Sequence, residues 1–226
     1  DVARRIAPLR TPAMLVPGNH DATSPFGVLA EAVGWLLSRP GAARRHRRRT
    51  EALARALNPV PVVGFSAHPL PQHGLTIVAG RPHAMDGLRV TFGRAIGVAS
   101  MEASRRRLEV LVDETAGPLL FVAHNGPRGL GDDRSAPFAL RRGRRDLGDP
   151  DLAAAIARAQ AQGRAVLAVV AGHLHHRGDD RRWASVVDGV LYVNAARVPR
   201  VFVRDGQILR HHVAITIAGG RAHASE

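Results

Sequence analysis

Three short apolar runs in this chain end abruptly, and each is followed by a histidine with glycine or asparagine beside it. The runs cover residues 13–16, 119–122 and 165–170, and they precede the motifs Gly18-Asn19-His20, His124-Asn125 and Gly172-His173-Leu174-His175. Continuous apolar runs of this length are typical of strands buried on both faces, in a sheet that helices cover. The pattern therefore predicts an α/β domain whose strands deliver histidines to one edge of the sheet.

The residues at these strand ends can bind a ligand, because ligands of open α/β sheets lie beyond the carboxyl ends of the strands. At the first end, a Pro-Gly turn is followed by an amide, an imidazole and a carboxylate in Asn19-His20-Asp21. At the third, His173 and His175 in extended geometry place both imidazoles on the same side, and Gly172 permits a sharp turn before them. The alternatives are an ordinary turn with a surface histidine and an exposed histidine-rich turn.

The absence of cysteine restricts the metal chemistry of the chain. Any metal ion must be held by histidine, asparagine, aspartate or glutamate, a ligand set that suits Zn, Fe, Mn or a similar ion. The 226 residues, 45% of them apolar, fit one domain with a sizeable core. Because no apolar stretch approaches the ~20 residues that span a bilayer and the first residues do not resemble a signal peptide, a soluble, cytoplasmic protein is expected.

A net charge of +13 would ordinarily suggest a polyanionic partner, but the composition of this chain weakens that interpretation. All 32 basic residues are arginine, and alanine is abundant, as a strongly GC-rich coding bias would produce without selection for nucleic-acid binding. The densest basic run, residues 44–49, lies between predicted helices at 27–37 and 50–57 and has no aromatic residue for base stacking. A solvated helical face is the favoured interpretation, with nucleic-acid binding as the alternative.

The remaining segments alternate helices with strands and then become β-rich. Helices are predicted over residues 100–114 and 149–163, with Asp149 as the N-cap of the second, and a strand over 75–79. Further strands are predicted at 183–187, 190–194 and 208–217, with hairpin signals at Asp188-Gly189 and Asp205-Gly206. The loop over 125–148 is long enough to be functional or mobile.

The order of the histidine motifs resembles the last three sequence blocks of the calcineurin-like metallophosphoesterase superfamily. These blocks are Gly18-Asn19-His20-Asp21, His124-Asn125 and Gly172-His173-Leu174-His175, and the segments 124–132 and 194–200 further resemble a subfamily known from photosynthetic microbes and plants. The resemblance implies a two-sheet β-sandwich flanked by helices, with two divalent metal ions at the strand ends. It also implies hydrolysis of a phosphate monoester or diester by a hydroxide that bridges the metals.

The resemblance also implies a role for each residue. Asn19, His124 and His173 would bind one metal ion, and His175 would bind the other. His20 would face the phosphorylated substrate and stabilise the transferring group or protonate the leaving oxygen, with Asp21 holding its orientation. The candidates for substrate contacts are His83, Asn125 and Arg128.

The chain departs from the family pattern at its start. The first two blocks of the family, an Asp-x-His and a Gly-Asp element that supply the metal-binding carboxylates, do not precede Gly18. We therefore expect residues 1–226 to form a single, N-terminally truncated domain that lacks its first strands and carries a helical, arginine-rich insert at about 25–58. Four neutral ligands would bind the second ion weakly, so this chain is expected to be inactive alone. The rival interpretation is a non-catalytic interaction module on the same fold.

Overall fold

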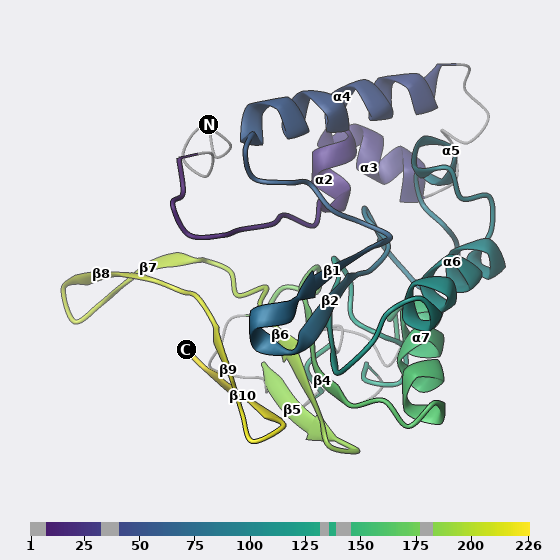
Figure 1. Ribbon diagram of the computed structural model, residues 1–226. Coiled ribbons are helices and arrows are strands. Elements are labelled where there is room, and N and C mark those ends of the chain that lie inside the picture. The colour runs from purple at the N-terminus through teal and green to yellow at the C-terminus, as the bar shows by residue number, and fades with distance from the viewer. Residues whose placement is uncertain (1–7, 33–40, 132–135, 139–145, 177–182) are drawn as a thin grey trace.

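A mixed six-stranded sheet forms the centre of the protein (Figure 1). The computed structural model describes residues 8–32, 41–131, 136–138, 146–176 and 183–226. In the strand order β1-β2-β3-β4-β6-β5, the four inner strands are parallel and an antiparallel strand lies at each edge. The strands are β1 (Ser66–Leu70), β2 (Leu75–Ala79), β3 (Leu119–Val122), β4 (Val166–Ala171), β5 (Ala184–Val187) and β6 (Val190–Asn194).

Two of the three apolar runs are inner strands of this sheet, as predicted. Strand β3 pairs with β2 on one side and with β4 on the other, and the side chains of β4 are almost all buried. Strand β2 has the predicted bounds. Strand β1 was not predicted, and it contains Pro69, a residue that sheets accept mainly at an edge.

The first apolar run, residues 13–16, is not a strand of the sheet, and this part of the prediction was wrong. It makes one isolated parallel bridge, in which the Leu15 amide donates to the Pro61 carbonyl at 2.9 Å and the Val63 amide donates to the Leu15 carbonyl at 2.8 Å. Pro61 has no N–H to donate and Pro17 ends the run, so the ladder cannot extend. The run still leads to Gly18, where the first polar motif begins.

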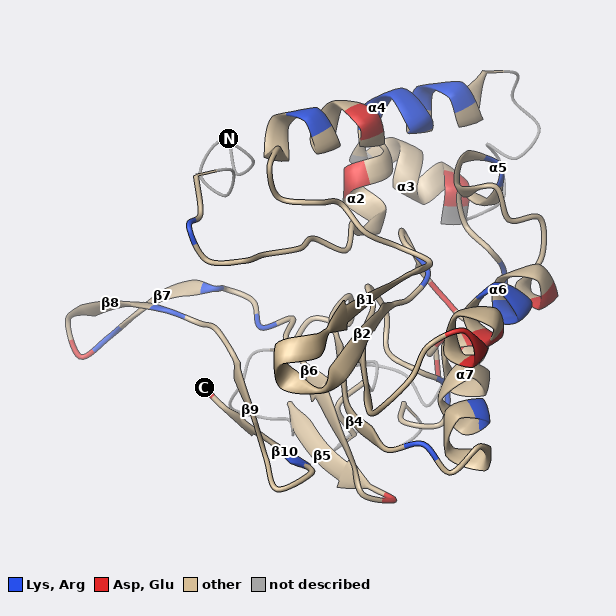
Figure 2. Ribbon diagram, in the orientation of Figure 1, with Lys and Arg blue, Asp and Glu red and all other residues tan. Residues whose placement is uncertain are grey.

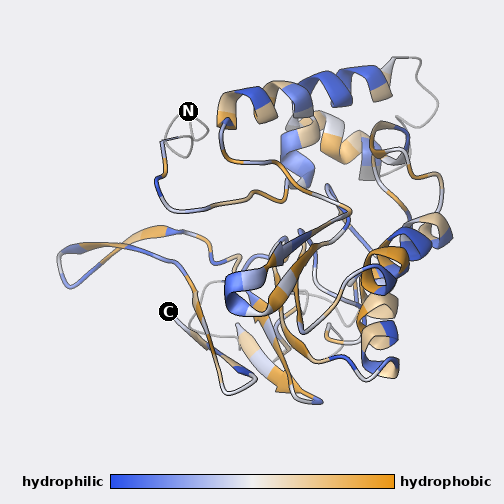
Figure 3. Cartoon of the chain, in the orientation of Figure 1, coloured by the Kyte–Doolittle hydropathy of each residue, from blue (hydrophilic) through white to orange (hydrophobic). Residues whose placement is uncertain are grey.

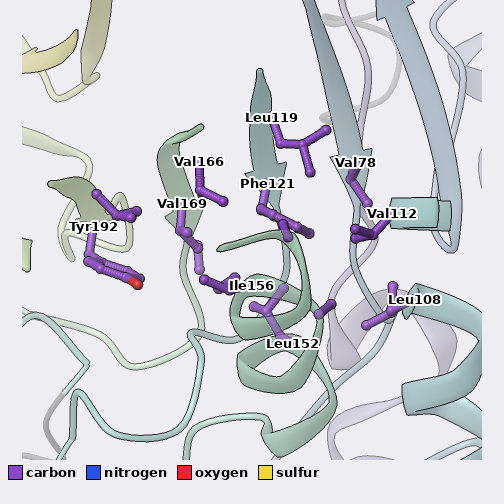
Figure 4. Packing of buried hydrophobic residues seen from close by; sticks show 14 of the residues in the cluster. Val78, Leu108, Val112, Leu119, Phe121, Leu152, Ile156, Val166, Val169 and Tyr192 are labelled. Carbon is purple, nitrogen blue, oxygen red and sulfur yellow. The ribbon is translucent and has the colours of Figure 1, made fainter. Parts of the chain in front are cut away.

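Helices α6 (Met101–Asp113) and α7 (Pro150–Ala161) pack together on one face of the sheet and form most of the core with it (Figure 4). Both helices were predicted. The Ser100 hydroxyl caps α6 by accepting from the Ala103 amide at 3.1 Å, and Gly163 follows α7 with φ +70°. The buried side chains of this cluster include Val78, Leu108, Val112, Leu119, Phe121, Leu152, Ile156, Val169 and Tyr192.

The other face of the sheet is covered by a two-stranded hairpin, β9 (Ala214–Ala218) and β10 (Arg221–Ser225). Its Ile215, Ala222 and Ala224 pack against a second buried cluster that contains Leu191 and Val193 of β6. Within the described residues, this face therefore carries a hairpin and not a second full sheet. The arrangement is an α/β fold, and the two-sheet sandwich of the prediction is not shown.

The C-terminal turns lie where Asp-Gly pairs predict them. Asp188 and Gly189 have φ of +49° and +77° between β5 and β6, and Asp205 and Gly206 have φ of +50° and +75°. The second pair joins β7 (Val201–Arg204) to β8 (Gln207–Arg210), a hairpin that extends away from the sheet in Figure 1. The predicted strand at 208–217 is thus divided between β8 and β9.

The arginine run lies inside a helix. Helix α4 (Ala42–Leu57) contains residues 44–49 and starts earlier than predicted, and its arginines are exposed. Their positions are blue along the α4 ribbon in Figure 2, and the helix is largely hydrophilic in Figure 3. Helix α3 (Pro25–Ala32) covers the first part of the predicted helix at 27–37, whose remainder lies outside the described residues. The other helical segments are α2 (Asn19–Ala22), α5 (Gly93–Ile96) and the 3-10 turn η1 (Pro71–His73). None of the described helices is long and apolar enough to cross a bilayer.

Candidate metal centre

An open cavity of about 630 Å³ lies at the carboxyl ends of β3 and β4. His124 follows β3 by two residues, and His173 follows β4 by two. The cavity is lined by every residue that the sequence assigned to catalysis or metal binding, although they come from three distant segments: Asn19, His20, Asp21, His124, His173 and His175. The fold therefore brings together the residues predicted for catalysis and metal binding.

Asn19 and His124 are in direct contact across the cavity. The Oδ1 atom of Asn19 lies 3.1 Å from Nε2 of His124. Two donor atoms that are each about 2.1 Å from one ion, at a right angle, lie about 3 Å apart, so this spacing fits two ligands of a common metal. Gly18 permits the approach, because a Cβ at this position would stand 2.6 Å from Cε1 of His124.

The imidazoles of His124 and His173 face each other edge to face, with ring centroids 4.9 Å apart. Burial lowers the pKa of His124 to about 3, and four neighbouring histidines act in the same direction. Burial also lowers the pKa of His173, against the opposing effect of the Met85 backbone. Both rings are therefore neutral near pH 7, the form in which imidazole binds a metal ion.

The backbone around His173 is a tight turn, in contrast to the extended geometry predicted for residues 173–175. His173 itself has φ +65°, and the Leu174 amide donates to the Gly172 carbonyl at 2.8 Å. Gly172 has an ordinary φ, and a Cβ there would meet its nearest neighbours only at 3.6 Å, so the sharp turn is made by the histidine and not by the glycine. Both His173 and His175 still line the cavity.

Asp21 closes the turn on which His20 stands. Its Oδ2 accepts a hydrogen bond of 2.8 Å from the Gly18 amide at the start of α2. No hydrogen bond joins Asp21 to His20, and both residues belong to the described part of the chain. Asp21 therefore contacts the backbone of the turn and not the His20 side chain, and His20 is exposed at the cavity.

The three predicted substrate contacts lie outside the lining of this cavity. His83 is buried behind the Asn19 turn, where its Nδ1 lies 2.7 Å from the Gly18 carbonyl. Asn125 is fully buried, and its amide nitrogen donates to the Asp149 carboxylate at 3.0 Å and to the Leu147 carbonyl at 2.8 Å. Arg128 is exposed and donates to the Gly87 carbonyl at 3.1 Å.

Arg200 is the one arginine that lines the cavity within the described residues. Its guanidinium suits a phosphate oxygen, but in a chain with 32 basic residues the sequence offers no signal that singles it out. The irregular segment that follows β6 places it there, together with Ala195, Ala196 and Val198.

A buried ionic network next to the site was not predicted. The Arg81 guanidinium donates to Asp149 at 2.7 Å and to Asp151 at 2.9 Å, and all three side chains are about 2% exposed or less. Asp149 stands at the N-cap position of α7, as predicted, but its carboxylate makes no capping bond. Burial raises the pKa of Asp149 to about 7, and the charge of Asp151 adds to this rise against the attraction of Arg81.

The donors at the cavity fit a metal ion in kind. They are imidazoles and an amide oxygen, which suit Zn, Fe or Mn. In the described residues, however, no three His, Cys, Asp or Glu side chains are arranged as a complete metal site, and Asp21 is the only carboxylate of the cavity lining. The ligand set of the described chain is therefore poor in the negative charge that two close cations need.

Comparisons with known proteins show to which family the chain belongs. The sequence model of the calcineurin-like phosphoesterases, whose members typically bind two metal ions, matches residues 1–177. No curated protein matches the chain. A solved crystal structure is similar with a TM-score of 0.50 at 13% identity, over 88% of this chain and 63% of that one, a likeness that shows the fold alone. Because the family model covers more than half of the 226 residues, the chain belongs to the calcineurin-like phosphoesterase family.

Proposed function

We propose that this protein acts in the metal-dependent hydrolysis of phosphate esters. The observation that carries the proposal is the convergence of Asn19, His124, His173 and His175 on one cavity at the strand ends. The contact of 3.1 Å between Asn19 and His124 and the neutral state of the buried imidazoles support metal binding at this point.

The residues of the cavity would bind two metal ions. Asn19, His124 and His173 would hold one divalent ion, and His175 would bind a second. Bound ions of this kind supply a hydroxide nucleophile and polarise the phosphoryl oxygens.

The remaining polar side chains of the cavity would act on the substrate. His20, exposed at the cavity, would donate a proton to the leaving oxygen or a hydrogen bond to a phosphoryl oxygen. Asp21 would keep the His20 turn closed through the Gly18 amide. Arg200 would hold a phosphate oxygen by its guanidinium.

The scarcity of carboxylates leads to a sharper proposal about activity. With Asp21 as the only acidic residue in the described lining, the second ion would bind weakly, and the 226-residue chain would hydrolyse esters at no more than background rates. A version extended at its N-terminus by an Asp-x-His and a Gly-Asp element would hydrolyse bis(p-nitrophenyl) phosphate with Mn²⁺. Clear Mn²⁺-dependent turnover by the 226-residue chain would contradict the proposed weakness of the second site.

Metal binding by the chain itself tests the site directly. Titration calorimetry with Zn²⁺ should show one tight ion. His124→Ala and His173→Ala should each weaken it by at least about tenfold, the cost that even the outer partners of ligands carry. His73→Ala, an exposed histidine on η1, is the matched control and should bind Zn²⁺ like the unaltered chain. Equal affinities for all four proteins would overturn the metal site.

A second candidate function is favoured by the same shortage of carboxylates. The chain would then be a non-catalytic interaction module that keeps the phosphoesterase fold. The extended version separates the two candidates. Hydrolysis that is lost in its His20→Ala variant supports the enzyme, and Zn²⁺ binding without hydrolysis in the extended version supports the module.

A further inference from the structure

A second cavity, of about 320 Å³, lies behind the Asn19 turn and between α4 and the sheet. Pro17, which precedes α2, and Ala22, the last residue of α2, form part of its wall, so it borders the turn of the candidate metal centre. Its volume lies within the range of about 300–1,000 Å³ that small-molecule sites occupy. Nothing in the proposed phosphoesterase reaction uses this cavity.

The interior of the second cavity is apolar. Its lining includes Val63 and Phe65 from the segment before β1, Ala54 from α4 and Ile96 from α5. Val63 and Phe65 are buried in the fold, whereas Ala54 and Ile96 are half-buried at the cavity. Such a surface favours the hydrocarbon or aromatic part of a ligand.

Two arginines give the rim of the second cavity a positive charge. Arg47 comes from α4 and Arg107 from α6, and the guanidinium of Arg107 lies 4.7 Å from the centre of the Phe65 ring. Neither makes an ion pair with a carboxylate of the described residues, although Glu51 also lines the cavity. Arg47 donates one hydrogen bond from Nη1 to the Arg94 carbonyl at 3.2 Å. Two guanidiniums with one carboxylate still leave donors for a ligand, a combination that recognises carboxylate, sulfonate or phosphate.

Two buried histidines add specific polar groups to the lining. Burial lowers the pKa of both His46 and His83, so both rings are neutral near pH 7. His83 donates from Nδ1 to the Gly18 carbonyl, which leaves its Nε2 as an acceptor without a partner among the described residues. His46 packs edge to face against Phe92 at 4.9 Å, and no described residue hydrogen-bonds its ring nitrogens.

We propose that this second cavity, lined by Ala54, Phe65 and His83 and rimmed by Arg47 and Arg107, binds a small amphipathic anion. The ligand has an aromatic or short alkyl body for the apolar interior and one carboxylate, sulfonate or phosphate group for the two guanidiniums. This site is independent of the proposed hydrolysis. Its occupant borders the turn that carries Asn19 and His20.

The probe that tests this site is 8-anilinonaphthalene-1-sulfonate, with uncharged N-phenyl-1-naphthylamine as its comparison. Binding of each is measured by titration calorimetry. Ala54→Phe fills the interior, and Arg47→Gln with Arg107→Gln removes the charge of the rim. The matched controls are Ala56→Phe and Arg48→Gln, which make the same changes at exposed positions of α4 outside the lining.

We expect Ala54→Phe to abolish binding of both probes to this site. The double arginine variant should weaken binding of the sulfonate by about tenfold or more, because it removes the charge-assisted hydrogen bonds to the anion. It should leave the uncharged probe unchanged. The two control variants should bind both probes like the unaltered chain.

Two results would overturn the proposal. The first is unchanged sulfonate affinity in both Ala54→Phe and the arginine variant, which would place the probe elsewhere. The second is an equal loss in Arg48→Gln, which would show a diffuse effect of positive charge. Far-ultraviolet circular dichroism of each variant verifies that the fold is retained, and a second interior variant, Ala95→Leu, replaces Ala54→Phe if that protein does not fold.

Discussion

Gly18 lies so close to His124 that a Cβ on Gly18 would stand 2.6 Å from the Cε1 atom of the imidazole. The φ of Gly18 is −90°, a value open to any residue, so the backbone does not require glycine here. The requirement comes from the space that the His124 ring occupies beside Asn19. A small residue in the first motif therefore sets the position of a ligand in the second.

Gly18→Ala is expected to displace the His124 ring and weaken Zn²⁺ binding by at least about tenfold, as loss of ligand orientation does. Calorimetric titration with Zn²⁺ measures the change. Gly172→Ala is the matched control, because a Cβ there meets ordinary contacts at 3.6 Å. If Gly18→Ala binds Zn²⁺ as tightly as Gly172→Ala, the steric link between the two motifs is wrong.

His83→Leu is expected to destabilise the fold by about 1–3 kcal/mol, because it leaves the Gly18 carbonyl without its partner at 2.7 Å. Urea unfolding at pH 7.5 gives this difference. His73→Leu changes an exposed histidine in the same way and should stay within about 0.5 kcal/mol of the unaltered chain. Similar urea unfolding midpoints for both variants would show that His83 does not stabilise the turn.

Arg81→Met is expected to cost about 3–5 kcal/mol, because it leaves the buried Asp151 carboxylate without its cation and removes the guanidinium hydrogen bond to Asp149. Thermal and urea unfolding measure the loss. Arg158→Met offers a comparison at equal distance, since Arg158 also lies 2.7 Å from its partner, Asp113, but both side chains are exposed by more than a third. Its unfolding midpoint should remain close to that of the unaltered chain, and an equal loss in both variants would show that burial is not the cause.

Asp149→Asn is expected to change how stability depends on pH. The pKa of Asp149 is raised in the folded state to about 7 from its ordinary value of 3.8, so between these values the folded protein holds a proton that the unfolded chain has lost. The contribution of Asp149 is fully present below pH 3.8 and falls by about 1.4 kcal/mol per pH unit as the pH rises toward 7.

The free energy of unfolding of the unaltered chain minus that of Asp149→Asn should therefore decrease between pH 4 and pH 7. Urea unfolding at four values of pH gives this difference, in which the titration of the histidines cancels. A difference that stays constant, or increases with pH, would mean that Asp149 is ionised in the folded protein throughout this range.

Helices and strands could be predicted from the sequence wherever the local pattern agrees with the tertiary surroundings. Strand β2 and helices α6 and α7 have the periodicity and the flanking residues of their type, and they lie close to the predicted bounds. The run at 13–16 has the same apolar character as β3. It fails to join the sheet because prolines interrupt both it and its partner at 61, a pairing 46 residues away that its own pattern does not reveal.

The candidate site, too, could be predicted only in part. The motifs predicted which residues gather at the cavity, whereas the roles of those residues stay predictions. The pairing of Arg81 with Asp149 could not be predicted, because it joins residues 68 positions apart in a chain with 32 basic residues. The Asp-Pro-Asp pattern at the start of α7 satisfies the ordinary requirements of a helix start, so it gave no sign that Asp149 and Asp151 also bind an arginine.

The position of His83 limits which substitutions this protein can accept during evolution. Its Nδ1 donates a hydrogen bond to the Gly18 carbonyl, and the residue also lines the second cavity. A substitution at this residue would alter both places in a single step, whereas Arg47 and Arg107 can change without reaching the Asn19 turn. Among related chains, ligand preference at the second cavity is therefore free to diverge at the rim, while its inner wall is constrained by the neighbouring centre.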